Sequence, residues 1–257
     1  MIKKPSILIL ITLGIFSCAP DPKRIEEADV HFRAANQLLI KGDPIQAMAE
    51  GLRAAKLDPK NSEIQNLLGI LYIQRNDFDQ AEKYFRESVH LQSTYSEGHN
   101  HLCALLIEKT KYDQAIKHCM KAVENVTYPT PERAYHNMGI AYERKGDISQ
   151  AIEAYKRGLV HNKNFVMSLK AYGKLLYDQR SYREAVGVLE SAAKVCNEVP
   201  KGTWRTECPE SFYLLSLTYI ALKKRKEAVT ALKGCVSADE EKGDYGKKCE
   251  ANLRIYK

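Results

Sequence analysis

Residues 62–95 read SEIQNLLGILYIQRNDFDQAEKYFRESVHLQSTY, and they contain the pattern on which most of the chain is built. In this stretch Gly69 precedes Ala81 by twelve residues, and Phe85 follows Ala81 by four. This spacing of residues recurs along the chain. Alanines 47, 81 and 115 lie 34 residues apart, as do alanines 151 and 185, and Ala228 follows after a longer gap. A fixed period of this length predicts a stack of similar units.

Small residues at fixed positions indicate two antiparallel helices in each unit. Helices approach closely only where small side chains meet, so we expect the glycines to face the alanines and larger residues to fill the groove. The expected facing pairs are Gly69 with Ala81, Gly139 with Ala151, and Gly173 with Ala185. Turn signals such as Gly42-Asp43, Asn76-Asp77 and Gly146-Asp147 separate the two helices.

This pattern resembles the tetratricopeptide repeat (TPR). The resemblance implies an all-α, right-handed superhelical solenoid of about six helix-turn-helix repeats. We place the solenoid at 28–242, with units at 28–61, 62–95, 96–129, 132–165, 166–199 and 209–242. A capping helix at 243–257 would cover the apolar edge of the last unit. Two insertions interrupt the period, one at 128–131 and one at 200–208 that holds Trp204, and insertions of this kind often lie on a binding face.

The amino terminus indicates export. Lys3 and Lys4 precede an apolar run at 7–16, which is too short to span a bilayer and is typical of a cleaved signal. Residues 15–18 (IFSC) resemble a bacterial lipobox, which implies a signal peptide at 1–17, a lipidated Cys18 and a short tether at 18–27. Ala19 after the cysteine favours outer-membrane sorting, with the protein facing the periplasm of a Gram-negative bacterium. The alternative is an ordinary secretory signal with a chance cysteine.

The composition is that of a globular protein, with 44% hydrophobic and 28% charged residues and a formal net charge of +7. Part of the positive excess lies at 223–226 and 247–257, where it would touch acidic headgroups or form a solvated turn and terminal helix. The modest charge, the export signal and the lack of a recognisable motif argue against a nucleic-acid partner.

Six cysteines remain when Cys18 is set aside, an even number in an oxidising compartment. The repeat frame favours three pairs: Cys103 with Cys119 inside one unit, Cys196 with Cys208 around the Trp204 insertion, and Cys235 with Cys249 between the last unit and the cap. Closing loops of this size stabilises a fold by roughly 3 kcal/mol each. The alternative is six buried free thiols.

We expect no catalytic site, metal site or cofactor. His99, His101 and His118 lie near Cys103 and Cys119, but their spacing matches no zinc template, and disulfide bonding would consume the thiolates. The sequence contains no nucleophile elbow, P-loop or H-E-x-x-H motif. A binding scaffold is therefore favoured over an enzyme.

The TPR resemblance implies a peptide-binding groove formed mainly by the first helix of each unit. The family positions that face this groove map to Phe32, Leu39, Asn66, Ile70, Ile73, Asn100, Ile107, His136, Ile140, Lys174 and Tyr177. A continuous apolar stripe of this kind usually marks a site for an amphipathic or extended segment. The alternative is that several of these side chains pack between adjacent units.

The whole chain resembles the type IV pilus pilotins, TPR outer-membrane lipoproteins of the pilus-biogenesis and social-gliding type. The resemblance rests on the lipobox, the six repeats, and residues 66–72 (NLLGILY), 84–89 (YFRESV) and 128–135 (YPTPERAY). It implies a protein that binds secretin subunits and promotes their outer-membrane insertion and multimerisation for pilus assembly and motility. A generic envelope adaptor that scaffolds cell-wall enzymes or polysaccharide export, and an enzyme subunit, stay open as alternatives.

Overall fold

The computed structural model describes residues 21–198, 207–239 and 243–256, and every regular element within these ranges is an α-helix. The elements are α1 (Pro22–Ile40), α2 (Pro44–Leu57), α3 (Ser62–Gln74), α4 (Phe78–Leu91), α5 (Ser96–Glu108), α6 (Tyr112–Glu124), α7 (Pro131–Lys145), α8 (Ile148–His161), α9 (Val166–Asp178), α10 (Tyr182–Glu198), α11 (Cys208–Ala221), α12 (Arg225–Ala238) and α13 (Asp244–Tyr256). They form six antiparallel pairs and one last helix that packs on α12. The expected all-α repeat solenoid with a capping helix is confirmed.

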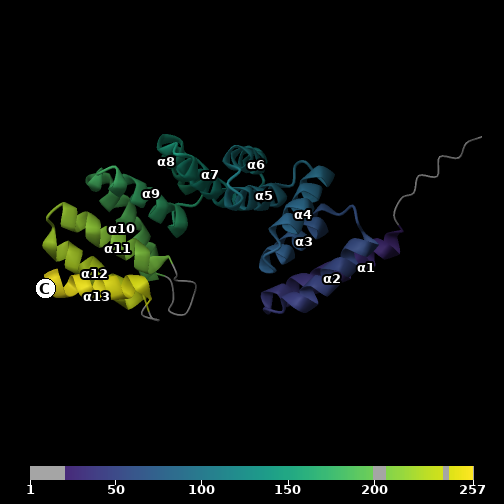
Figure 1. Cartoon of the computed structure of the whole chain (residues 1–257), viewed down its shortest axis with the longest axis horizontal. Helices are drawn as coiled ribbons and strands as arrows, with labels where there is room; N and C mark the ends of the chain where they lie inside the picture. The colour runs from purple at the N-terminus through teal and green to yellow at the C-terminus, as the bar shows by residue number, and fades with distance from the viewer. Residues whose placement is uncertain (1–20, 199–206, 240–242, 257) are drawn as a thin grey trace, which may run out of the picture.

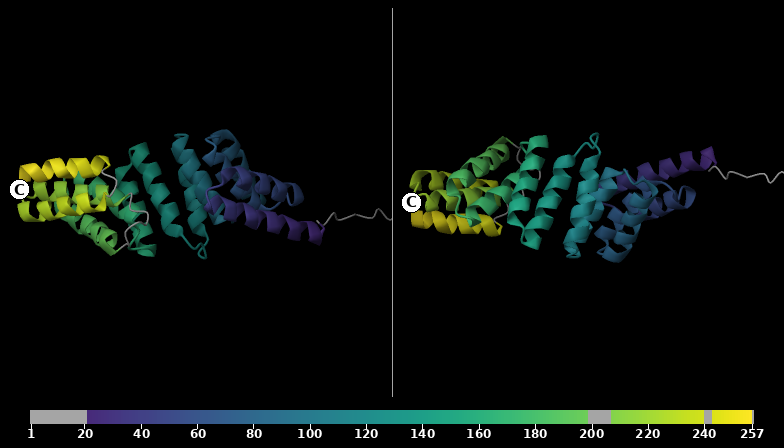
Figure 2. Two further views of the ribbon diagram at one scale, coloured as in Figure 1. Left: turned by 90° about the horizontal axis from the view of Figure 1, so that it is seen from below. Right: turned by 90° about the horizontal axis from the view of Figure 1, so that it is seen from above.

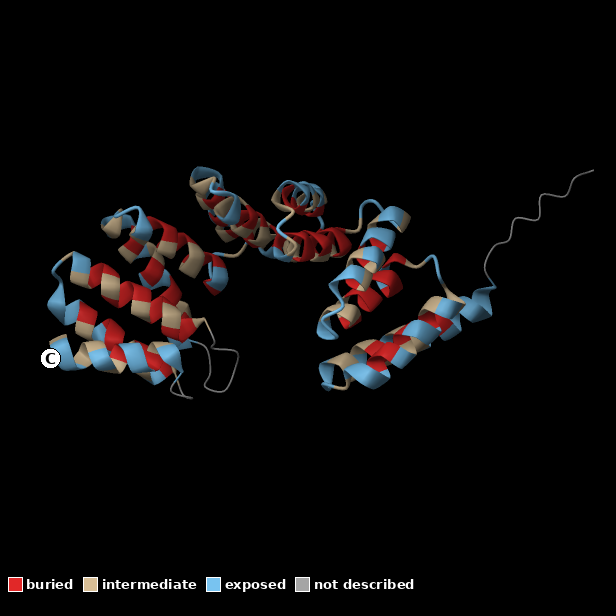
Figure 3. Ribbon diagram, viewed as in Figure 1, coloured by how far each residue is buried: buried red, intermediate tan, exposed pale blue. Residues whose placement is uncertain are grey.

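The helix pairs stack side by side into an arch. In Figure 1, α1–α4 form one limb, α5–α8 the crown and α9–α13 the other limb. Figure 2 shows the successive pairs stacked along the long axis of the molecule. At the crown, α5 and α7 lie on the inner side of the arch, whereas α6 and α8 lie on the outer side. Buried residues follow the seams between helices (Figure 3), so each unit is stabilised mainly by its immediate neighbours.

Each turn inside a unit requires one residue in the left-handed region. Gly42 and Gly146 supply it with φ of 79° and 91°. The same register holds Asn76, Thr110, Arg180 and Lys223, with φ between 57° and 61°. Several second helices then begin with a capping aspartate, and the side chains of Asp43, Asp77 and Asp147 accept hydrogen bonds from the backbone nitrogens of Gln46, Gln80 and Gln150.

The glycines of the repeat face large side chains rather than the alanines that we expected. A Cβ atom placed on Gly69 would lie 2.4 Å from the ring of Phe85, four residues after Ala81. The same contact recurs between Gly139 and Tyr155 and between Gly173 and Leu189. The glycine therefore makes room for one bulky side chain from the partner helix, and the buried alanine allows the two backbones to approach.

The first helix begins earlier than the predicted tether at 18–27 allows. Asp21 accepts a hydrogen bond from the backbone nitrogen of Lys23 at 3.1 Å, and Pro22 occupies the first turn, where its missing N–H costs nothing. Residues 22–27 are consequently helical. Cys18 and Trp204 lie outside the described residues.

Three disulfides join adjacent helices within the part of the chain from α5 to α13. They link α5 to α6 (Cys103–Cys119), α10 to α11 (Cys196–Cys208) and α12 to α13 (Cys235–Cys249). These are the pairs that the repeat frame predicts. Among the described helices, none combines the length and apolar character that a membrane span needs.

Candidate functional site

An apolar pocket lies between the first helices of the second and third units. Its volume is about 290 Å³. Its lining comes from α3, α4 and α5: Ile70, Ile73, Phe78, Phe85, His101, Ala104, Leu105 and Glu108. We call it the α3–α5 pocket.

A small side chain on α5 accounts for the space. Ala104 stands eleven residues before the unit's marker alanine, a register that holds Ile70 in the second unit and Ile140 in the fourth. Because Ala104 lacks the isoleucine side chain, a hollow remains between Ile70, Ile73 and the ring of Phe78. Phe78 is 43% exposed, so its ring presents an apolar surface at the edge of the hollow.

His101 lies in the pocket wall as a neutral ring. Burial lowers its pKa to about 4, and the charge of Arg133 adds to the effect. Its Nδ1 lies 2.8 Å from Asn66 Oδ1, and its ring packs at a tilt against Phe85. At neutral pH the wall therefore carries no charge at this point, which suits an apolar side chain of a partner.

Three predicted groove residues are polar connectors between units instead. Asn66, Asn100 and His136 are each only 6% exposed. Asn66 contacts His101, Asn100 accepts a hydrogen bond from Asn137 Nδ2 at 2.9 Å, and His136 Nδ1 lies 3.1 Å from Ser168 Oγ. Buried polar groups need such partners, so these side chains hold neighbouring first helices in register.

Ile107 is a further correction, because we expected it to line an open groove. It is 2% exposed and belongs to a core cluster with Met138 and Ala141 of α7. Its counterpart in the second unit, Ile73, is only partly buried. The difference arises because α7 packs directly over the end of α5 that carries Ile107.

The remaining predicted groove residues are all partly buried. Ile70 and Ile73 line the α3–α5 pocket. Phe32 and Leu39 pack in the core of the first unit, and Ile140 and Tyr177 pack at the edges of later clusters. Lys174 Nζ lies 3.0 Å from Asp178 Oδ2. The structure thus brings two of the eleven residues together in one pocket and distributes the others along the seams.

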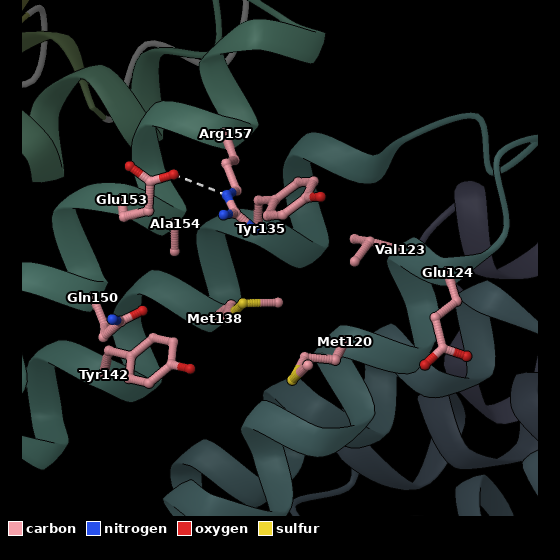
Figure 4. Close-up of a pocket in the computed structure, with 10 residues that line it drawn as sticks. All are labelled: Met120, Val123, Glu124, Tyr135, Met138, Tyr142, Gln150, Glu153, Ala154 and Arg157. Carbon is pink, nitrogen blue, oxygen red and sulfur yellow. Dashed lines mark hydrogen bonds and ion pairs between the residues drawn. The ribbon is translucent and has the colours of Figure 1, made fainter.

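A second pocket opens on the outer side of the crown. It has a volume of about 340 Å³ and is lined by Met120, Val123 and Glu124 of α6, Tyr135, Met138 and Tyr142 of α7, and Gln150, Glu153, Ala154 and Arg157 of α8. Figure 4 shows Met120 and Met138 pointing into the space between α6 and α7, with the Glu153–Arg157 ion pair (2.9 Å) on the far side. Met120 is 51% exposed, so this pocket is also partly apolar.

The insertion at 128–131 lies next to this second pocket. The connection from α6 to α7 spans residues 125–130, whereas the connection from α4 to α5 spans 92–95. Tyr128 turns inward from the longer connection, is 5% exposed and packs on Ala122 and Ala134. The tyrosine therefore fills the gap that two extra residues open, and at this junction the insertion serves packing.

Phe78, His101 and Ala104 contribute to the α3–α5 pocket and were absent from the predicted groove. A signal for Ala104 existed, because it shares the register of Ile70 and Ile140. Phe78 opens the second helix of its unit, directly after the predicted turn at Asn76-Asp77. Among the described residues, no group of three or more His, Cys, Asp or Glu side chains is placed to hold a metal ion.

Sequence comparisons identify the repeat. Models of the tetratricopeptide repeat match residues 38–100, 94–159, 136–200 and 209–242. The chain is a tetratricopeptide-repeat protein. The TPR matches cover five of the six helix pairs in full or nearly so, and they begin within α1 of the first.

Two proteins of type IV pilus assembly are similar to this one over most of their length. The type IV pilus assembly protein PilF of Pseudomonas aeruginosa is 22% identical over 191 residues, which are 71% of this chain and 76% of PilF. A solved structure of P. aeruginosa PilF superposes with a TM-score of 0.75 at 19% identity and covers 90% of this chain and 99% of that one. The structure of PilW, a widely conserved type IV pilus biogenesis factor, superposes with a TM-score of 0.73 at 20% identity and covers 86% of this chain and 97% of that one.

Proposed function

We propose that this TPR protein is a pilotin: a lipoprotein held in the outer membrane through Cys18, facing the periplasm, that binds secretin subunits and promotes their localisation and multimerisation for type IV pilus assembly. In this role it is a binding scaffold and performs no catalysis. The observation that carries the proposal is the sequence similarity to PilF, a type IV pilus assembly protein, across three quarters of PilF's length.

The α3–α5 pocket supplies a physical basis for binding. Its walls are mostly apolar, its histidine is neutral, and its volume accommodates one or two large aliphatic or aromatic side chains. Pockets of this kind on helical repeats receive the anchor residues of an amphipathic helix or an extended segment. A central apolar anchor often contributes 2 kcal/mol or more to binding, so one such contact would dominate the affinity.

The test fills the pocket without changing the fold. Ala104→Ile should fold normally, since isoleucine already occupies this register at 70 and 140. Ala251→Ile, on the exposed side of α13, is the matched control for the same chemical change. Both variants would be expressed in place of the wild-type protein, and partners would be recovered from detergent-solubilised envelopes.

Wild-type protein and Ala251→Ile should recover a secretin and support secretin multimers and surface pili. Ala104→Ile should accumulate to the same level and lose most of the secretin. Recovery of cell-wall enzymes or polysaccharide exporters in place of a secretin by the wild-type protein would refute the proposed function. Normal secretin assembly with Ala104→Ile would show that the partner binds elsewhere, with the second pocket on the outer side as the next site to fill.

A further inference from the structure

The first unit carries exposed apolar side chains on α2. Ile45 is 82% exposed and Leu52 is 43% exposed, and Ala49 between them is exposed as well. Spacings of four and seven residues place the three side chains on one face of the helix. The opposite face holds the buried Ala47 and Ala54. We call Ile45, Ala49 and Leu52 the α2 outer stripe.

The repeat itself does not call for apolar residues at these positions. The register of Ile45 is occupied in the other units by Asp79, Asp113, Ser149, Arg183 and Lys226. The register of Leu52 is occupied by Arg86, Lys156, Glu190 and Lys233, with Met120 beside the second pocket as the exception. Five units thus pack in the same way with a mostly polar outer face. Packing within the unit therefore does not explain the apolar stripe of the first unit, and we infer that another surface covers it.

The short length of chain between Cys18 and α1 indicates which surface covers the α2 outer stripe. Pro22 begins α1, and Cys18 stands only four residues earlier. Four extended residues span at most about 14 Å, so a lipid on Cys18 holds the start of α1 close to the bilayer. Arg24 Nη2 donates a hydrogen bond to the backbone carbonyl of Lys56 at 3.3 Å, which places the last turns of α2 beside that start. Leu52 lies one turn before Lys56.

We propose that the α2 outer stripe rests on the bilayer that carries the lipid anchor. Ile45 and Leu52 would lie at the boundary between the headgroups and the acyl chains, and Lys56 would lie at the level of the headgroups. Helices with an apolar stripe and a flanking lysine bind membrane surfaces in this way. The inference rests on the proposed lipidation of Cys18. It would fix one side of the first unit against the membrane and orient the rest of the arch away from it.

The test measures depth with a fluorescent probe on the intact lipoprotein. Leu52→Cys and Lys156→Cys place a thiol at the same register of α2 and α8. Six of the seven cysteines are in disulfides, and the seventh is the proposed lipid site, so an environment-sensitive dye reacts with the new thiol. The labelled protein is reconstituted into phosphatidylethanolamine–phosphatidylglycerol vesicles that contain nitroxide lipid, and flotation is measured in parallel.

The probe at 52 should emit at shorter wavelength and be quenched severalfold more than the probe at 156. A third sample, Ala49→Cys with Ile45→Asp and Leu52→Asp, should still float but lose the quenching that Ala49→Cys alone shows. Flotation with equal, weak quenching at 52 and 156 would overturn this inference and leave the anchor intact. No flotation would remove the anchor and this inference together. A shift at 52 that appears in detergent and grows with protein concentration would assign the stripe to a second copy of the chain.

Discussion

The contact between Gly69 and Phe85 makes a sharp prediction about packing. In Gly69→Ala the new Cβ atom would lie 2.4 and 2.5 Å from two atoms of the Phe85 ring and 2.9 Å from a third. Phe85 is 2% exposed and packs against His101, and the α3–α5 pocket is the one cavity described above that its ring lines. The ring must therefore shift towards that pocket, or helices α3 and α4 must separate locally.

The expected free-energy change follows from two opposing effects. Overpacking a well-packed core costs about 1–3 kcal/mol, and a contact this short belongs at the upper end. Replacing glycine by alanine inside a helix stabilises by about 1 kcal/mol. The net loss for Gly69→Ala should be about 2 kcal/mol. Gly187→Ala is the control, because its Cβ atom would meet nothing within 4 Å and only the gain of up to about 1 kcal/mol remains.

Urea unfolding followed by circular dichroism measures both variants against the wild-type protein. The midpoint should fall for Gly69→Ala and rise for Gly187→Ala, with little change in slope. Adding Phe85→Leu to Gly69→Ala should recover part of the loss, since a smaller side chain relieves the contact. Equal midpoints for the two alanine variants would refute the close-packing explanation of the repeat glycines.

Three further predictions test burial, protonation and covalent links. Ile107→Asp should destabilise the fold by about 3 kcal/mol or more, because it removes a buried side chain and buries a carboxylate. Ile73→Asp should destabilise it by only about 1 kcal/mol. Comparable urea midpoints for the two variants would contradict the assignment of Ile107 to the core. Burial lowers the pKa of His136 to about 4 from 6.5, and the folded state therefore favours the neutral ring. The contribution of the neutral His136 ring to the free energy of unfolding is complete above pH 6.5 and is lost as the pH falls from 6.5 towards 4, at up to about 1.4 kcal/mol per pH unit. His136→Gln should flatten this part of the pH–stability curve. An unchanged curve would contradict the lowered pKa of His136. Replacing Cys196 and Cys208 by serine should lower stability by roughly 3 kcal/mol in non-reducing buffer, and a variant as stable as the wild-type protein would show that the bridge adds nothing.

Periodicity predicts the helix pairs and the cysteine pairs because both depend on spacing along the chain. Cys103 and Cys119, for example, face each other wherever two helices of a 34-residue unit pack antiparallel. The start of α1 was less predictable, since the cap at Asp21 lies outside the repeat frame. Local capping chemistry, and not the repeat, decides where that helix begins.

The binding surface depends on how neighbouring units sit against each other, and a repeat pattern does not contain this information. Ile73 and Ile107 share a register, yet only Ile107 is covered by the next first helix. The α3–α5 pocket exists through missing volume at Ala104, which a search for large apolar residues overlooks. Asn66 fits a groove position by register, but its hydrogen bond with His101 directs it into the seam.

The distribution of disulfides has a consequence for how the arch opens. All three bridges lie in α5–α13, and residues 21–95 contain no cysteine. Because stability in a solenoid is transmitted only between neighbours, the two uncrosslinked units should fray first, and amide hydrogens in α1–α4 should exchange with solvent faster than those in α10–α13. The α3–α5 pocket straddles this boundary, with one wall on the labile part and the other on a helix that is covalently held. A partner that fills the pocket would contact both parts and hold the labile part against the crosslinked one. Its binding should therefore slow hydrogen exchange in α3 and α4 far more than in α5.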